Sequence, residues 1–218
     1  MDRVKKIMGK ASLGIKRPKP ESKLTIYERP ERPEEKKEYY DKHIQKDATM
    51  DEYWMKMYRQ AISYLPPVEE NPAIMDLGCG PGYFAEVLYS DGYMNYLGVD
   101  FSTVCIEKAQ ERVPMLQFMP GDLYDKWIQE KFAEFDFFFA LEVLEHLKRD
   151  KEVIGAIPSG KKVIISVPNN DGQGHVRIFG GVGEMQKWYE GFIEFEDVQT
   201  IYRGRGTVSF FMGYGTRS

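Results

Sequence analysis

The sequence predicts an α/β fold, with a doubly wound, mostly parallel sheet of seven strands, an antiparallel last strand and helices on both faces. From residue 73 onwards, short apolar runs alternate with helical patterns, which is typical of a parallel sheet. The last two apolar runs lie too close together for a crossover helix, so the final strand should run antiparallel. A chain of 218 residues is long enough for one such domain with a sizeable core.

Each expected strand is a short apolar run bounded by turn residues. In chain order the strands span Ala73–Leu77, Tyr96–Asp100, Leu116–Met119, Phe135–Ala140, Lys162–Val167, Phe192–Tyr202 and Thr207–Gly215. The run Phe135–Ala140 is apolar throughout, which suits a strand buried on both faces. A glycine-rich turn, Arg203–Gly206, separates the last two strands.

Helices are expected in the intervals between strands. Pro81–Ser90 has a proline in its first turn, where the missing N–H is tolerated. Ser102 should cap a helix that runs to about Arg112, because its hydroxyl can accept a hydrogen bond from the first turn. Two more helices are expected over Leu141–Lys148 and residues 183–191.

Three parts are expected along the chain. Residues 1–35, rich in Lys, Arg, Glu and Pro, read as a basic arm without fixed structure. Residues 36–70 form a helical cap, because apolar and aromatic residues recur at three- and four-residue intervals until Pro66-Pro67. The α/β domain occupies residues 71–218. The arm is either a solvated segment or an electrostatic contact with nucleic acid or a membrane.

Composition and charge narrow the setting. The net charge of −4 gives no general attraction to nucleic acid. The two cysteines, Cys79 and Cys105, suggest no disulfide framework, which fits a reducing compartment. No apolar run is long enough to cross a bilayer, and the basic N-terminus lacks the apolar core of a secretory signal. A cytoplasmic location is therefore expected.

The first strand leads into a glycine loop, Asp-x-Gly-x-Gly-x-Gly over residues 76–82. Alternate glycines allow a tight turn and a close approach to a ligand, and the helix behind them offers unpaired N–H groups. The spacing differs from the dinucleotide fingerprint. It resembles the first motif of the class I S-adenosylmethionine-dependent methyltransferases. That resemblance, which covers roughly residues 70–215, implies a Rossmann-like fold and S-adenosyl-L-methionine as the cofactor.

Later strand ends carry the other elements of that resemblance. Asp100 would accept the ribose hydroxyls, with Phe101 against the adenine, and Asp122 would accept the adenine amino group while Leu123 packs on the ring. The acidic residue before the glycines would hold the methionine ammonium group. The resemblance assigns the following residues to the cofactor: Asp76, Gly78, Cys79, Gly80, Gly82, Tyr83, Asp100, Phe101, Asp122, Leu123 and Leu141.

Two further motifs resemble the group of ubiquinone-type O-methyltransferases and bacterial small-molecule and sugar methyltransferases. They are Glu-Val-Leu-Glu-His at residues 142–146 and Ser-Val-Pro-Asn at residues 166–169. The chain departs from the group's pattern over Lys148–Gly160, which is short and ends in Ala-Ile-Pro-Ser-Gly. The motifs of nucleic-acid amino-methylating and pyrimidine carbon-5 enzymes are missing, so a small-molecule or sugar oxygen or nitrogen acceptor is favoured.

Two alternatives stay open at this point. The basic arm, together with Arg203 and Arg205, would suit an RNA or protein acceptor. A non-catalytic S-adenosylmethionine-binding module would keep the same cofactor motifs. The sequence predicts no oligomeric state.

The catalytic candidates are His146 and His175 as bases, with Glu145 as an orienting group. The alternative interpretation of His146 is a structural histidine beneath the cofactor, and Arg177 shares the loop of His175 as a substrate-binding candidate. No metal is expected. The alternative is a divalent-metal site, in which Glu142, Glu145 and His146 share one helix face and His175 completes the set. That pattern resembles the metal-dependent small-RNA 2′-O-methyltransferases, although their second histidine-rich segment is not evident here.

Overall fold

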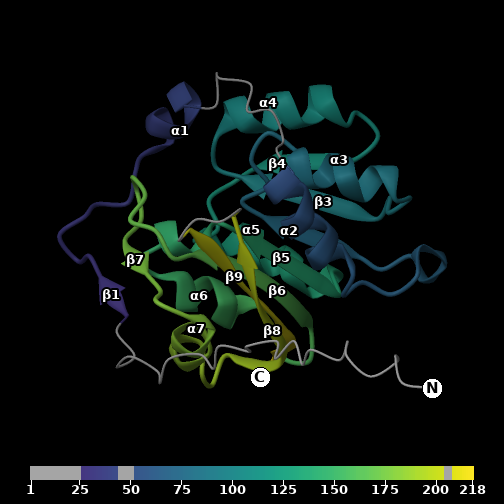
Figure 1. Ribbon diagram of the computed structural model, residues 1–218. Helices are drawn as coiled ribbons and strands as arrows, with labels where there is room; N and C mark the ends of the chain where they lie inside the picture. The colour runs from purple at the N-terminus through teal and green to yellow at the C-terminus, as the bar shows by residue number, and fades with distance from the viewer. Residues whose placement is uncertain (1–25, 44–51, 204–207) are drawn as a thin grey trace, which may run out of the picture.

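The computed structural model describes residues 26–43, 52–203 and 208–218. A twisted sheet crosses the centre of the molecule, with helices on both sides of it (Figure 1). Its strands are β2 (Ile74–Leu77), β3 (Tyr96–Asp100), β4 (Gln117–Pro120), β5 (Phe137–Leu141), β6 (Lys162–Pro168), β8 (Ile193–Tyr202) and β9 (Ser209–Arg217).

The seven strands lie in the order β4-β3-β2-β5-β6-β9-β8. Strands β2 to β6 are parallel, whereas β9 runs antiparallel to both of its neighbours, β6 and β8. The predicted doubly wound sheet with an antiparallel last strand is therefore confirmed. The chain winds outward in opposite directions from β2 and β5, so the switch point where open α/β sheets bind ligands lies between these two strands.

Two hydrophobic layers cover the sheet, because neighbouring residues of a buried strand face opposite sides. In β5, Phe138 packs with one layer and Phe139 with the other, and Val163 and Ile164 of β6 divide in the same way. Helices α2 (Glu52–Ile62) and α3 (Tyr83–Ser90) contribute to the layer of Phe139. The layer of Phe138 includes residues of α5 (Lys126–Gln129), α6 (Asp150–Ala156) and α7 (Val182–Trp188).

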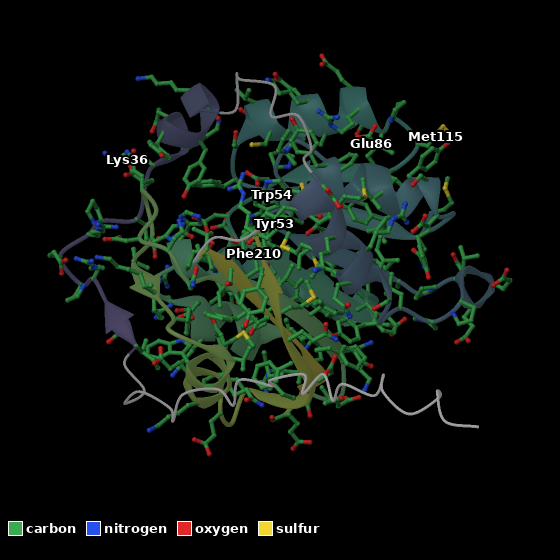
Figure 2. The ribbon with its side chains drawn as sticks, viewed as in Figure 1. Lys36, Tyr53, Trp54, Glu86, Met115 and Phe210 are labelled. Atoms are coloured by element: carbon green, nitrogen blue, oxygen red, sulfur yellow. The ribbon has the colours of Figure 1, made fainter. Side chains whose placement is uncertain are left out.

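Helix α2 is held on the sheet by aromatic contacts. Tyr53 stacks on Phe210 of β9 with ring centroids 4.5 Å apart, and Trp54 lies 5.1 Å from the same ring (Figure 2). Such pairs add to the stability gained from burial alone. Helix α4 (Thr103–Arg112) begins as predicted, since the hydroxyl of Ser102 accepts a hydrogen bond from the backbone N–H of Cys105 at 3.1 Å.

The helix predicted over Leu141–Lys148 is wrong. Strand β5 continues to Leu141, and only a short 3₁₀ turn follows, at Leu144–His146. Glu142 adopts a left-handed φ of 58°, and its N–H donates to the Ser166 carbonyl at 3.2 Å, so the chain keeps following β6 and leaves the helical path. Glu142, Glu145 and His146 therefore do not share a helix face.

The N-terminal segment (residues 26–43) also differs from the prediction. Residues 26–35 were expected to lack structure, yet β1 (Tyr27–Glu28) pairs antiparallel with β7 (Arg177–Ile178), and α1 (Lys37–His43) follows (Figure 1). These contacts depend on residues far along the chain, which local composition does not report. The one helical stretch expected from about Glu34 to Leu65 is represented by α1 and α2.

Several smaller differences remain. The short helices α5 and α6 were not predicted, while most other boundaries moved by one or two residues, as is usual for frayed ends. Residues 1–25 of the predicted arm and residues 204–207 of the predicted turn lie outside the described residues. In the part of the chain that the structure describes, no helix has the length and apolarity needed to cross a membrane.

Candidate functional site

A cavity of about 220 Å³ opens at the carboxyl ends of the central parallel strands, beside the switch point. Its wall combines the loops after β2 to β5 with the N-terminal segment. The lining residues are Glu34, Glu35, Tyr40, Gly78, Gly80, Asp100, Phe101, Cys105, Gly121, Asp122, Leu123, Tyr124, Glu142, Val143, His146 and Leu147.

The glycine loop after β2 requires its glycines at two positions. Gly78 has a φ of +76°, and an added Cβ would lie 2.5 Å from Cγ2 of Val143. Gly82 has a φ of +82°, and its Cβ would lie 3.0 Å from the backbone of Ala109. At Gly80, by contrast, a Cβ would meet nothing within 4 Å, and Gly80 lines the cavity. The loop thus presents bare backbone to a ligand.

Asp100, at the end of β3, is held by two backbone donors. Its Oδ2 accepts the N–H of Gly80 at 3.0 Å, and its Oδ1 accepts the N–H of Ser102 at 2.8 Å. A carboxylate oxygen can accept two hydrogen bonds, so each oxygen keeps capacity for a ligand hydroxyl. Burial raises the pKa of Asp100, and the two backbone hydrogen bonds oppose that rise.

The other predicted cofactor residues fall into two groups. Phe101, Asp122 and Leu123 line the cavity, and the N–H of Tyr124 fixes Asp122 by donating to its Oδ1 at 2.9 Å. The residues outside the lining are Asp76, Cys79, Gly82, Tyr83 and Leu141.

Asp76 is buried in the core below the loop. Its Oδ2 accepts a hydrogen bond from the Tyr96 hydroxyl at 2.7 Å. Burial raises the pKa of Asp76 to about 7, although the Tyr96 hydrogen bond favours the charged form. The structure thus places this carboxylate against β3 and away from the cavity lining.

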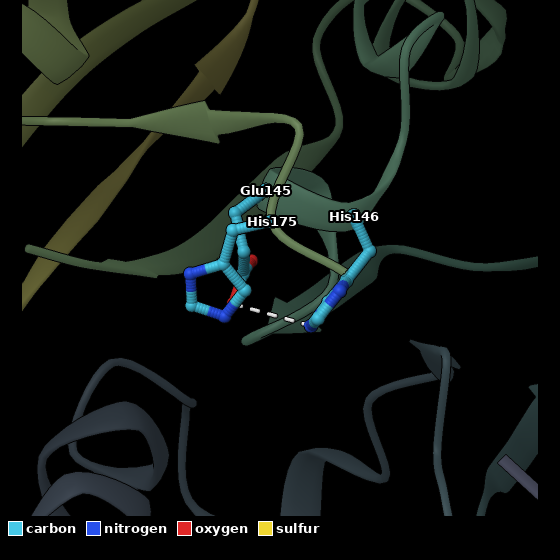
Figure 3. Close-up of side chains that lie close together, drawn as sticks. All are labelled: Glu145, His146 and His175. Carbon is cyan, nitrogen blue, oxygen red and sulfur yellow. Dashed lines mark ion pairs between the residues drawn. The ribbon is translucent and has the colours of Figure 1, made fainter. Parts of the chain in front are cut away.

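Three candidate catalytic side chains converge at the far end of the cavity: Glu145, His146 and His175 (Figure 3). Each offers a ligand atom, and these atoms lie within 4.8 Å of one another. Glu145 Oε1 is 3.8 Å from His146 Nε2, and the two imidazole rings meet edge to face with centroids 4.8 Å apart. Glu145 Oε2 and His146 Nδ1 are buried without a hydrogen-bond partner.

Burial controls the charge of this cluster. It lowers the pKa of His146 to about 4, with a further contribution from His175, and it also lowers the pKa of His175. Burial raises the pKa of Glu145, which Arg177 opposes. Both imidazoles are therefore neutral near neutral pH, so they can accept a proton or donate a lone pair to a metal ion.

Glu142 lines the cavity but lies outside this cluster in the described chain. Its Oε1 accepts a hydrogen bond from the Ser166 hydroxyl at 2.9 Å. Burial and the nearby Glu145 raise its pKa. The structure thus brings together three of the four ligands in the alternative metal set.

Sequence reasoning missed the wall formed by the N-terminal segment. Tyr40 meets Phe101 edge to face with centroids 5.2 Å apart and lies 5.9 Å from the His146 ring. Glu34 Oε1 accepts hydrogen bonds from the Tyr124 hydroxyl, at 2.7 Å, and from the backbone N–H of Lys148. No local signal could have found these residues, because the Pro-rich and charged composition around them is typical of a loop.

Arg177 is not part of the cavity lining. Its guanidinium is 3% exposed and pairs with Asp150 at 2.8 Å, and it lies over the Trp188 ring at 4.2 Å. The hydroxyl of Tyr189 donates to the same Asp150 oxygen at 2.7 Å. The structure therefore places Arg177 in a buried charge pair behind the catalytic candidates.

Comparisons with known proteins agree with this arrangement. Residues 74–158 match the family model described as a methyltransferase domain. The chain is 31% identical over 124 residues to a trans-aconitate 2-methyltransferase of Rhodopseudomonas palustris (strain HaA2), a match that covers 54% of this chain and 47% of the relative. The counterpart from Sinorhizobium medicae (strain WSM419) is 32% identical over 117 residues, covering 51% and 44%. The chain thus spans about half the length of these curated relatives.

Solved structures share the fold. The N-methyltransferase NodS from Bradyrhizobium japonicum WM9 superposes with a TM-score of 0.62 at 12% identity, covering 83% of this chain and 97% of NodS. The methyltransferase domain of bacterial CtHen1-C gives a TM-score of 0.56 at 19% identity, covering 76% and 100%. With the glycine loop, the strand order and the matched family model, these findings show that the chain belongs to the class I S-adenosylmethionine-dependent methyltransferase superfamily.

Proposed function

We propose that the protein is an enzyme that transfers a methyl group from S-adenosyl-L-methionine to an oxygen or nitrogen of a small molecule. The observation that carries this proposal is the cavity at the switch point, where the bare backbone of Gly80 and the oriented carboxylate of Asp100 meet. The names of the trans-aconitate 2-methyltransferases support a small-molecule acceptor.

The residues present fit this cofactor. Asp100 would accept the ribose hydroxyls, because two backbone N–H groups fix its carboxylate and leave acceptor capacity on both oxygens. Phe101 and Leu123 would hold the adenine between apolar surfaces, and Asp122 would accept its amino group. The role of Asp76 at the ammonium group stays a prediction, since its side chain lies outside the cavity lining.

When bound, S-adenosylmethionine supplies an activated methyl group on a positively charged sulfur. The protein must then align the acceptor and, where the acceptor carries a proton, remove that proton. His146 is the base on the cavity wall, and its lowered pKa keeps it neutral and able to accept a proton near neutral pH. Glu145 and His175 orient it from behind.

Titration calorimetry with S-adenosylmethionine and with its demethylated product, S-adenosylhomocysteine, tests the cofactor assignment. Both should bind at one site per chain. A tritiated methyl group on the cofactor should then appear in the small-molecule fraction of a metabolite extract. Absence of binding for both compounds would overturn the proposal, and binding without transfer would favour the non-catalytic module instead.

One observation favours a second candidate function, metal-assisted methylation of a hydroxyl. The ligand atoms of Glu145, His146 and His175 lie within 4.8 Å of one another, and Glu145 Oε2 and His146 Nδ1 lack partners. A carboxylate with two neutral imidazoles is a donor set that several divalent cations accept. Such an ion would lower the pKa of an acceptor hydroxyl that binds to it.

A chelator separates the two candidates. If a metal assists transfer, excess chelator should abolish methyl transfer without unfolding the protein, and added Mn²⁺ or Mg²⁺ should restore it. Mn²⁺ binding followed by calorimetry should be lost in His175→Ala. Full methyl transfer in excess chelator would end the metal-assisted candidate and leave His146 as the base.

A further inference from the structure

The acceptor side of the cavity is acidic. The N-terminal segment contributes Glu34 and Glu35 to its wall, and the end of β5 contributes Glu142. Among the described residues, no lysine or arginine lines this cavity. An anion that entered it would face like charges at short range without a compensating cation, and such a juxtaposition costs several kcal/mol.

The nearest cations are already neutralised. The Arg32 guanidinium pairs with Asp171 at 2.6 Å, and Arg177 pairs with Asp150 at 2.8 Å. The ammonium of Lys148 donates to the carbonyl of Pro30 at 3.1 Å, and Lys148 does not line the cavity. None of these groups is placed to balance a negatively charged ligand.

Two carboxylates lack partners where a ligand would supply them. Glu145 is 1% exposed, and its Oε2 has no hydrogen-bond partner. The side chain faces His146, which forms part of the cavity wall (Figure 3). The described part of the chain offers the Glu35 carboxylate no hydrogen bond or ion pair either. Buried acceptors without donors are costly, so a ligand with N–H donors would relieve this cost.

Aromatic faces add to this preference. Tyr40 and Phe101 meet at the cavity wall with ring centroids 5.2 Å apart, next to His146. The faces of such rings attract cations, by about 0.5–2 kcal/mol depending on exposure. Carboxylates and aromatic rings together form the usual environment for an ammonium group.

From this wall we infer that the methyl acceptor is a small-molecule amine that enters the cavity as its ammonium ion. The inference rests on the proposed function and narrows it from oxygen or nitrogen to nitrogen. Glu35 is the specificity residue, because its carboxylate belongs to the N-terminal segment and has no structural partner. An anionic acceptor such as trans-aconitate is excluded by the same charges.

An ammonium must lose one proton before its nitrogen has a lone pair that can accept a methyl group. The unpartnered Oε2 of Glu145 is placed to take that proton, either directly or through His146, whose Nε2 lies 3.8 Å from Oε1. The acidic wall thus has two roles. It attracts the protonated amine, and it removes the proton that would block the reaction.

The test compares two probes of similar shape and opposite charge, benzylamine and benzoate, on protein saturated with S-adenosylhomocysteine. Protein-observed NMR titration should show benzylamine binding at least about ten-fold more tightly than benzoate, the effect of roughly one unscreened charge contact. Glu35→Gln should reduce that preference to about three-fold or less. Glu38→Gln is the matched control, because Glu38 is exposed on the same segment and lies outside the cavity lining, and it should leave the preference unchanged.

Equal binding of the two probes, tighter binding of benzoate or no binding of either would overturn the inference. Methylation of trans-aconitate by the wild-type protein would also overturn it, while leaving the proposed function intact. Failure of S-adenosylhomocysteine to bind would instead contradict the proposed function, and the preference between the two probes would still be measurable on the free protein.

Discussion

Asp100→Asn should weaken S-adenosylmethionine binding by roughly 100-fold or more, because charge-assisted hydrogen bonds contribute about 1.5–3 kcal/mol each. In the wild-type protein both carboxylate oxygens accept backbone N–H groups, from Gly80 and Ser102. An asparagine must point its own NH₂ at one of these donors, which leaves a buried N–H unsatisfied. The substitution therefore removes the charge and also distorts the glycine loop.

Titration calorimetry measures this effect, and thermal unfolding checks that the variant is folded. Glu107→Gln is a suitable control, since Glu107 is exposed on helix α4, which begins just after Asp100, and it does not line the cavity. Its dissociation constant should stay within about two-fold of the wild-type value, as expected for an exposed charge. Asp100→Asn protein that is folded and binds with wild-type affinity would show that the ribose is not held here.

Asp150→Ala should lower the free energy of unfolding by about 3–5 kcal/mol, the usual cost of removing one partner of a buried ion pair. Asp150 is 1% exposed and accepts from Arg177 at 2.8 Å, from the Trp188 indole N–H at 2.8 Å and from the Tyr189 hydroxyl at 2.7 Å. Alanine would leave the Arg177 charge and two other donors buried without an acceptor. Urea denaturation at constant m-value measures the change.

The neighbouring pair Arg149–Glu152 provides the matched control, because it has similar geometry at the surface. Its nitrogen–oxygen distance is 3.0 Å, and both side chains are about half exposed. Glu152→Gln should change the free energy of unfolding by less than about 0.5 kcal/mol. If Asp150→Ala were as mild as this control, the buried network would not be a source of stability.

The sequence predicted the sheet well because the signals for it are local. Hydrophobic runs such as Phe135–Ala140 must be buried on both faces, and the crossover helices between them force a parallel order. The glycine loop was also readable, since Gly78 and Gly82 adopt backbone angles that favour glycine. Asp100 and Asp122 follow strands whose carboxyl ends meet at one edge, so their proximity needed no further information.

The errors arose where distant contacts override local preference. Glu-Val-Leu-Glu-His reads as a helix, but the hydrogen bond from the Glu142 N–H to the Ser166 carbonyl holds the chain against β6. The convergence of Glu145, His146 and His175 therefore comes from a 3₁₀ turn meeting a distant loop, and helical periodicity has no part in it. Glu35 and Tyr40 were missed because nothing near them in the sequence marks them as cavity residues.

The pairing of β1 with β7 determines when the cavity wall can form during synthesis of the chain. Arg29 bonds to Asp171, 142 positions later, so the ribosome must have made most of the protein before these two side chains can meet. The glycine loop and Asp100 need only the first half of the sheet, whereas Glu34, Glu35 and Tyr40 wait for the second. The nucleotide half of the site should thus mature before the half that selects the acceptor, since contacts between distant residues form slowly.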